Sequence, residues 1–131
     1  MGIIMEVRAM AQETKNLDVL INKIGYQIVE DIKKKENEIT KYKDKIEKSL
    51  GVLANDGVYA YYVYVKSKKV DDIFLNKLKP LIEYCDTPLQ GNNWQQFFEE
   101  LSKDLPSLLF FREILEKILI YARYHAKAME D

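Results

Sequence analysis

The side chains that carry out most protein chemistry are sparse in this sequence, and their spacing assembles no reaction centre. His125 is the only histidine and Cys85 the only cysteine, so one chain cannot supply a histidine pair, a disulfide or a cysteine-based zinc site. Arg112 and Arg123 precede His125 by thirteen and two residues, spacings that do not match the arginine–histidine pairs of helical ribonucleases. The sequence therefore predicts no catalytic residue, no metal ligand and no cofactor.

The remaining candidates for catalysis have the wrong local context. No serine lies in a nucleophile elbow, and no glycine-rich phosphate loop occurs among the five glycines. Glu99 and Glu100 are adjacent, so on a helix they point to different faces and cannot act as a carboxylate dyad. Cys85 falls on an apolar stripe, where a lone cysteine is interpreted as a small core residue rather than a reactive thiol. We expect a protein without enzymatic activity.

Charge is balanced overall but uneven along the chain. Twenty lysines and arginines face twenty-one acids, a net charge of −1, which argues against a protein that holds nucleic acid by bulk positive charge alone. Residues 41–69 carry seven lysines against three acids, and residues 83–104 carry five acids against one lysine. This asymmetry suits docking onto a polyanion or head-to-tail packing of copies, although two solvated surfaces would give the same pattern.

Tyrosines accompany the basic segment. The nine tyrosines include Tyr59, Tyr61, Tyr62 and Tyr64, which one helix cannot direct into a single core. We expect Tyr59 or Tyr64 to point outward, next to the lysines of residues 66–69. Aromatic rings beside amines bind RNA bases and phosphates, although an ordinary amphipathic helix end has the same composition.

Helical periodicity supplies the elements that position these residues. Apolar residues recur at spacings of three and four in five stretches, which predicts amphipathic helices, and residues 94–101 predict one short helix more. The stripes are Leu17, Leu20, Ile21, Ile24, Ile28, Ile32; Ile39, Tyr42, Ile46, Leu50, Leu53; Val58, Tyr61, Tyr62, Val65; Val70, Ile73, Phe74, Leu78, Leu81, Ile82, Cys85; and Leu108, Phe111, Leu115, Ile118, Tyr121, Ala122.

The segment 58–65 is ambiguous because its β-branched and aromatic residues favour a strand, and Asn-Asp-Gly at 55–57 can close a hairpin. No other segment offers a third strand, and an isolated hairpin is marginally stable in water. We therefore predict a helix over 58–65, with Asp56 as its cap. Asn93 with Gln96 predicts a capped start for the short helix, and Asp104 before Pro106 predicts the start of the last helix.

Together these elements predict an all-α protein, residues 1–131 forming a single-domain bundle of five to six helices whose only long connection is 86–92. The longest apolar run, residues 58–65, is too short to cross a bilayer, and the first residues lack the features of a secretory signal. We expect a cytoplasmic protein that does not enter a membrane.

Three stretches of the sequence follow one another in a recognisable order. Residues 25–32 (GYQIVEDI) precede a charged run to Lys45. Residues 50–58 (LGVLANDGV) join an apolar run to a polar-glycine turn, and residues 59–68 then form an apolar segment that ends in basic residues. Residues 118–129 (ILIYARYHAKAM) pass from apolar side chains to basic ones and alanines. In this order they resemble the small, all-helical subunit of the type III-B CRISPR effector, the RNA-guided ribonuclease called the Cmr complex.

The resemblance implies an architectural, non-catalytic role in antiviral defence. Small subunits of this family stack as a minor filament beside the subunits that carry guide RNA, and they line the groove in which target RNA pairs with the guide. The implied partners are the other subunits of the complex, copies of the chain itself, guide RNA and target RNA. Clustering and the basic ends of the resembling stretches give the residues expected to contact the RNA backbone: Lys41, Lys45, Lys48, Lys66, Lys68, Lys69, Arg123 and Lys127.

Three other interpretations stay open. The chain could be the small helical subunit of another CRISPR effector class, which would share both the architecture and the role in lining the groove. It could be a stand-alone helical module that binds a protein through a surface formed by Trp94, Phe97 and Phe98, although helical spacing favours the bundle core for these three rings. It could also be a nuclease active only as an oligomer, with His125 as the residue to test.

Overall fold

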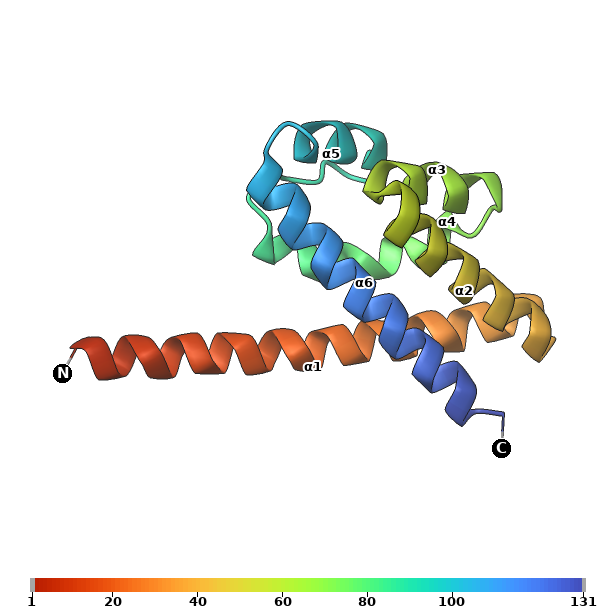
Figure 1. Cartoon of the computed structure of the whole chain (residues 1–131), viewed down its shortest axis with the longest axis horizontal. Helices are drawn as coiled ribbons and strands as arrows, with labels where there is room; N and C mark the ends of the chain where they lie inside the picture. The colour runs from red at the N-terminus through yellow and green to blue at the C-terminus, as the bar shows by residue number, and fades with distance from the viewer. Residues whose placement is uncertain (1, 131) are drawn as a thin grey trace.

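The computed structural model describes the backbone of residues 2–130 and the side chains of residues 16–38 and 40–130. Every regular element in that part of the chain is helical, and no strand is present in it, which confirms the all-α prediction (Figure 1). The elements are α1 (Gly2–Glu36), α2 (Ile39–Asp56), α3 (Val58–Ser67), α4 (Asp71–Phe74), the 3₁₀ helix η1 (Asn76–Tyr84), α5 (Trp94–Leu101) and α6 (Leu105–Ala128).

The last helix, α6, makes extensive packing contacts in the bundle. α6 packs against α1 and α2, α2 packs against α3, and the other helices cover the remaining side of one apolar core. Figure 1 shows α6 crossing the second half of α1, while the first half of α1 extends beyond the bundle. Gly25 lies at this crossing, where an added Cβ would stand 2.9 Å from the carbonyl oxygen of Ile118 and 3.1 Å from the amide nitrogen of Ala122. Only glycine therefore allows the two helices to approach this closely.

The ambiguous segment is helical, as predicted. The four buried side chains of α3 are those of the predicted stripe, Val58, Tyr61, Tyr62 and Val65. The predicted cap is wrong, because Asp56 is the last residue of α2 and Gly57 occupies the N-cap position of α3 without a side-chain bond. Gly57 has a φ of 96°, a conformation open to glycine, so the chain turns directly from one helix into the next.

The single helix predicted over residues 70–85 is wrong in form. The chain makes one α-helical turn in α4 and continues as the 3₁₀ helix η1, which contains Pro80. Proline has no N–H for an α-helical hydrogen bond and disfavours the helical conformation of the residue before it. The buried residues Leu75, Leu78 and Leu81 recur every three positions, which matches the three residues per turn of a 3₁₀ helix.

The remaining boundaries agree with the sequence. The Asn93 side chain accepts a 3.2 Å hydrogen bond from the backbone N–H of Gln96 at the start of α5. Asp104 is the N-cap residue of α6, but its carboxylate accepts a 2.5 Å bond from the Ser107 hydroxyl instead of capping a backbone N–H. Residues 85–93 form the long connection without helix. Within the described residues, no helix is both long and apolar enough to span a bilayer.

Candidate nucleic-acid interface

Three of the predicted lysines form a row on α2. Lys41, Lys45 and Lys48 are separated by four and three residues, so their side chains leave the same side of the helix. The Asp44 carboxylate lies 3.1 Å from Lys48 Nζ, and the Glu38 carboxylate lies 3.8 Å from Lys41 Nζ. Exposed ion pairs of this kind contribute at most about 1 kcal/mol, so a phosphate can replace either carboxylate.

The row continues across the contact between α2 and α3. Lys68 Nζ lies 5.9 Å from the ring centroid of Tyr64, and the Tyr64 hydroxyl is buried without a hydrogen-bond partner in the described structure. Burial raises the pKa of Tyr64, while the positive charge of the nearby Lys48 opposes that rise. Lys68 therefore lies beside the Tyr64 ring, and Lys48 is near enough to act on the Tyr64 hydroxyl electrostatically, although the two lysines are twenty positions apart in the sequence. We call Lys41, Lys45, Lys48, Lys68 and Tyr64 the α2–α3 flank.

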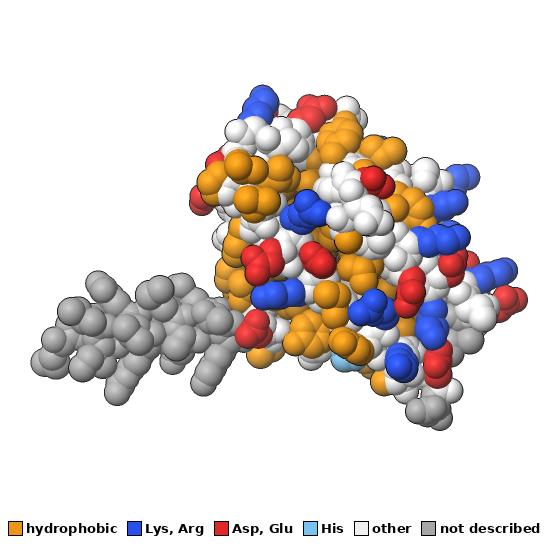
Figure 2. Space-filling view, viewed as in Figure 1, with side chains coloured by type: hydrophobic (Ala, Val, Ile, Leu, Met, Phe, Trp, Pro, Cys, Tyr) orange, Lys and Arg blue, Asp and Glu red, His pale blue; other side chains and the backbone are white. Residues whose placement is uncertain are grey.

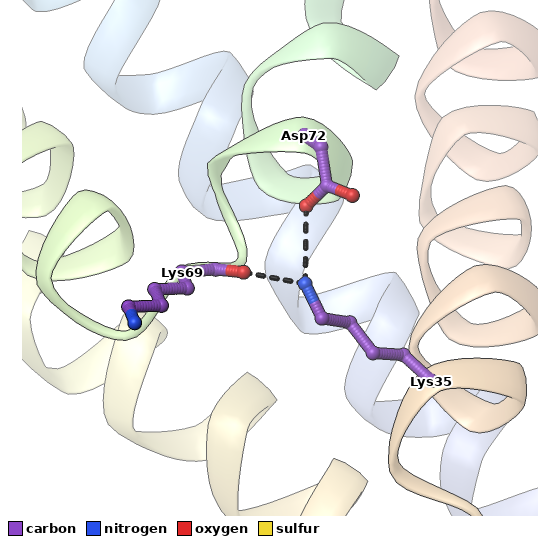
Figure 3. Close-up of polar contacts among 3 residues, drawn as sticks. All are labelled: Lys35, Lys69 and Asp72. Atoms are coloured by element: carbon purple, nitrogen blue, oxygen red, sulfur yellow. Dashed lines mark hydrogen bonds and ion pairs between the residues drawn. The ribbon is translucent and has the colours of Figure 1, made fainter.

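Lys66 and Lys69 have different surroundings and do not belong to this flank. Lys66 Nζ is 5.7 Å from the ring centroid of Tyr62, which packs against Phe98 of α5. The Lys69 backbone has a φ of 59°, and its carbonyl oxygen accepts a hydrogen bond from Lys35 Nζ. Figure 3 shows that the same amine faces Asp72, 3.4 Å away, while the Lys69 side chain points away from Lys35. Lys35, at the end of α1, thus fixes the turn between α3 and α4 that contains Lys69.

Arg123 and Lys127 belong to a second surface. They line a groove of about 350 Å³ between α2 and α6, together with Lys43, Glu47 and Tyr124. Lys43 forms an ion pair with Glu130, and this contact raises the pKa of the lysine, so its amine stays charged. We call these five lining residues the α2–α6 groove. Lys43 was not among the predicted contacts, because only the packing of α2 on α6 brings it beside Arg123.

The eight predicted residues therefore do not share one surface: six divide between the α2–α3 flank and the α2–α6 groove, and Lys66 and Lys69 belong to neither. Successive residues of an α-helix are rotated by about 100°, which directs Lys43 and Lys45 to nearly opposite sides. Figure 2 shows lysine and arginine side chains over α2 and along the edge that α2 and α3 form, interspersed with acidic ones. The acidic segment 83–104 includes α5 and reaches the start of α6, at the end of the bundle away from the start of α2 (Figure 1).

No reaction centre emerges among the described side chains. His125 Nε2 lies 2.7 Å from Asn22 Oδ1, and its ring packs edge-on against Tyr26 at 5.3 Å between centroids. Burial raises the pKa of the half-buried Cys85 thiol to about 11, which keeps it protonated and unreactive near neutral pH. No three His, Cys, Asp or Glu side chains in the described part of the chain are arranged to hold a metal ion.

The aromatic side chains of α5 are core residues, as favoured by the sequence. Trp94, Phe97 and Phe98 are buried and pack against one another and, through the two phenylalanines, against Phe111 of α6. The surface required by the protein-interaction alternative is therefore not formed by these rings. A different apolar surface lies at the start of α6, where Leu105 is 63% exposed and Leu109 and Phe110 are also exposed. No pattern in the sequence marks these three residues as exposed, because Leu109 and Phe110 continue the apolar composition of the last helix.

Comparisons of the chain with protein-family models, curated proteins and solved structures found no match in any of the three.

Proposed function

We propose that the chain is a non-catalytic small subunit of a type III-B (Cmr) CRISPR effector complex, which contacts RNA phosphates in the cytoplasm. The observation that carries the RNA-binding part is the α2–α3 flank, where three lysines leave one side of α2 and Lys68 lies beside the Tyr64 ring of α3, the helix that packs against α2. The three resembling stretches of sequence support the kind of complex.

The chemistry of the flank suits contact with a backbone rather than with bases. Lysine amines are compact charges that attract phosphates and carry no sequence information by themselves. In a guided complex, base pairing between guide and target supplies the specificity, so a small subunit needs only such contacts. The net charge of −1 predicts weak RNA binding by the isolated chain and stronger binding when other subunits hold the RNA in place.

Assembly with other subunits and with copies of the chain is supported by surfaces away from the flank. The exposed Leu105, Leu109 and Phe110 form an apolar surface at the start of α6, and exposed apolar patches commonly mark protein contacts. The acidic segment lies away from the start of α2, although α5 packs against α3 of the basic segment, and this uneven charge favours head-to-tail stacking of copies in a filament.

Two alternatives compete with this proposal. A small subunit of another CRISPR effector class would use the same surfaces, and only its partner subunits would distinguish it. A stand-alone protein-interaction module is favoured by the apolar start of α6, and it would bind its partner without RNA. Substitution of Leu109 by Asp would abolish binding to such a partner.

The RNA contact is tested by the salt dependence of binding. We expect the plot of log affinity against log salt concentration, measured for an RNA duplex, to lose about 0.7 to 0.9 in slope for each contacting lysine replaced. Lys48→Ala and Lys68→Ala should each show this loss. Lys103→Ala, at the acidic end, is the matched control and should leave the slope unchanged. An unchanged slope in both flank variants would overturn the proposed contact.

A further inference from the structure

The α2–α6 groove contains an aromatic ring that the phosphate contacts described above do not require. Tyr124 is 60% exposed, more than any other exposed tyrosine of the described chain. It shares the groove with the cations of Lys43, Arg123 and Lys127, against a single lining carboxylate, Glu47. The exposed ring offers a flat apolar surface for stacking, and the surrounding cations attract an anion. Together they suit a ligand that is both planar and anionic.

We propose that this groove binds an unpaired RNA nucleobase stacked on Tyr124, with the adjoining phosphates held by Lys43, Arg123 and Lys127. The inference rests on the proposed function, because it takes RNA as the ligand, and it assigns a separate role to this groove. The α2–α3 flank would contact paired RNA through its phosphates, whereas the groove would take a nucleotide outside the duplex.

The geometry around Tyr124 favours stacking. The Arg123 guanidinium carbon lies 5.8 Å from the Tyr124 ring centroid, so a planar cation stands next to the ring and can continue the stack. Tyr121 lies one helical turn before Tyr124 and is also exposed, which extends the aromatic surface along α6. Figure 2 shows hydrophobic side chains beside basic ones where α6 crosses α1.

The groove has the charge and size for one nucleotide. Its volume of about 350 Å³ falls at the lower end of the range of roughly 300 to 1,000 Å³ for small-molecule sites. Lys43 is paired with Glu130, which lines an adjoining hollow rather than the groove, so an incoming phosphate would replace Glu130 as the anionic partner of Lys43. The site therefore accepts an anion without leaving a lysine unpaired.

The test compares single-stranded with duplex RNA. Fluorescence anisotropy at low salt would measure binding of the full chain to a labelled uridine oligonucleotide and to a duplex of equal length. Tyr124→Leu keeps an apolar side chain but removes the ring, Tyr124→Trp restores a ring, and Tyr84→Leu alters an exposed tyrosine within the acidic segment. Because Tyr124 is exposed, these variants should fold, and circular dichroism would verify it.

We expect Tyr124→Leu to weaken binding of the single strand about 5- to 150-fold, the range for loss of one base–aromatic stack, while duplex affinity changes less than twofold. Tyr124→Trp should bind the single strand as the wild type does, and Tyr84→Leu should have no effect. If Tyr124→Leu binds the single strand normally, the stacking site is overturned. If the variant instead loses self-association in sedimentation, the groove is a protein contact.

The two proposals can fail separately. Loss of salt slope in Lys48→Ala and Lys68→Ala, together with a normal Tyr124→Leu, would retain the proposed function and reject the stacking site. Failure of the wild-type chain to bind either RNA at low salt would reject both.

Discussion

The hydroxyl of Tyr61 donates a 2.7 Å hydrogen bond to the main-chain carbonyl oxygen of Phe74. Both side chains are fully buried, and the bond joins α3 to the short helix α4. Burial raises the pKa of Tyr61 well above its ordinary value, so the phenol stays protonated and remains a donor. A tyrosine can thus belong to the core of this bundle because its one polar atom has a partner there.

Removal of this hydroxyl should destabilise the fold. We expect Tyr61→Phe to lower the free energy of unfolding by about 1–2 kcal/mol, because the Phe74 carbonyl loses its buried donor. Urea denaturation would measure the change. Tyr59→Phe is the matched control on the exposed side of α3 and should change the stability little. Equal stabilities of the Tyr61→Phe variant and the wild type would contradict the assignment of this bond to the core.

The close crossing of α1 and α6 gives a second prediction. Gly25→Ala places a Cβ against main-chain atoms of Ile118 and Ala122, which cannot move without displacing α6. We expect a loss of about 1–3 kcal/mol in stability, the usual cost of overpacking. Thermal unfolding followed by circular dichroism would measure it.

Gly51 provides the matched control for that substitution. It lies inside α2, and an added Cβ would meet no atom within 4 Å. Alanine is favoured over glycine in a helix interior, so Gly51→Ala should raise the stability by about 0.5–1 kcal/mol. A stabilising Gly25→Ala, or a strongly destabilising Gly51→Ala, would contradict the helix packing described above.

The Cys85 thiol should respond to pH in a defined direction. Its pKa is raised to about 11, against about 8.5 for a cysteine in an unfolded chain. Alkylation by iodoacetamide should therefore be slow at pH 8 and accelerate with each pH unit up to about 11. Between these two pKa values the unfolded chain binds fewer protons than the folded one, so this group contributes stability below pH 8.5 that is lost as the pH rises to 11.

Two comparisons would check this behaviour. The dependence of stability on pH above 8.5 should be weaker in Cys85→Ala than in the wild type. Rapid alkylation of the native protein at pH 7 would show that the thiol is accessible and ionised, contrary to the structure.

Much of the fold could be predicted from the sequence because the buried apolar residues of a helix recur every three or four positions. A helix over 58–65 is predicted against local strand propensity because no third strand is available, and the structure buries Val58, Tyr61 and Val65 on one face of that helix. The type of helix formed by η1 is harder to predict from the sequence. Leu75, Leu78 and Leu81 fit the apolar stripe of an α-helix about as well as that of a 3₁₀ helix. Pro80 was the signal that could have decided between them.

The candidate site could be predicted only in part. Lys48 and Lys68 are both in the basic segment, but their shared proximity to Tyr64 depends on how α2 packs against α3. Composition also grouped Lys43 with Lys45, although the helix directs them to different surfaces. A count of charges along the chain contains no information about the side of a helix, and the partner helices determine which side stays exposed.

The most direct test of the central claim is affinity purification of the tagged chain from its own host, with the bound proteins and RNAs identified together. We expect guide RNAs containing repeat sequence, a large polymerase-like subunit and the subunits that carry the guide RNA. A sample in which Lys48 and Lys68 are both replaced by alanine should retain the proteins and lose target RNA. Recovery of a single unrelated protein without RNA would contradict the account and point to the exposed surface around Leu109.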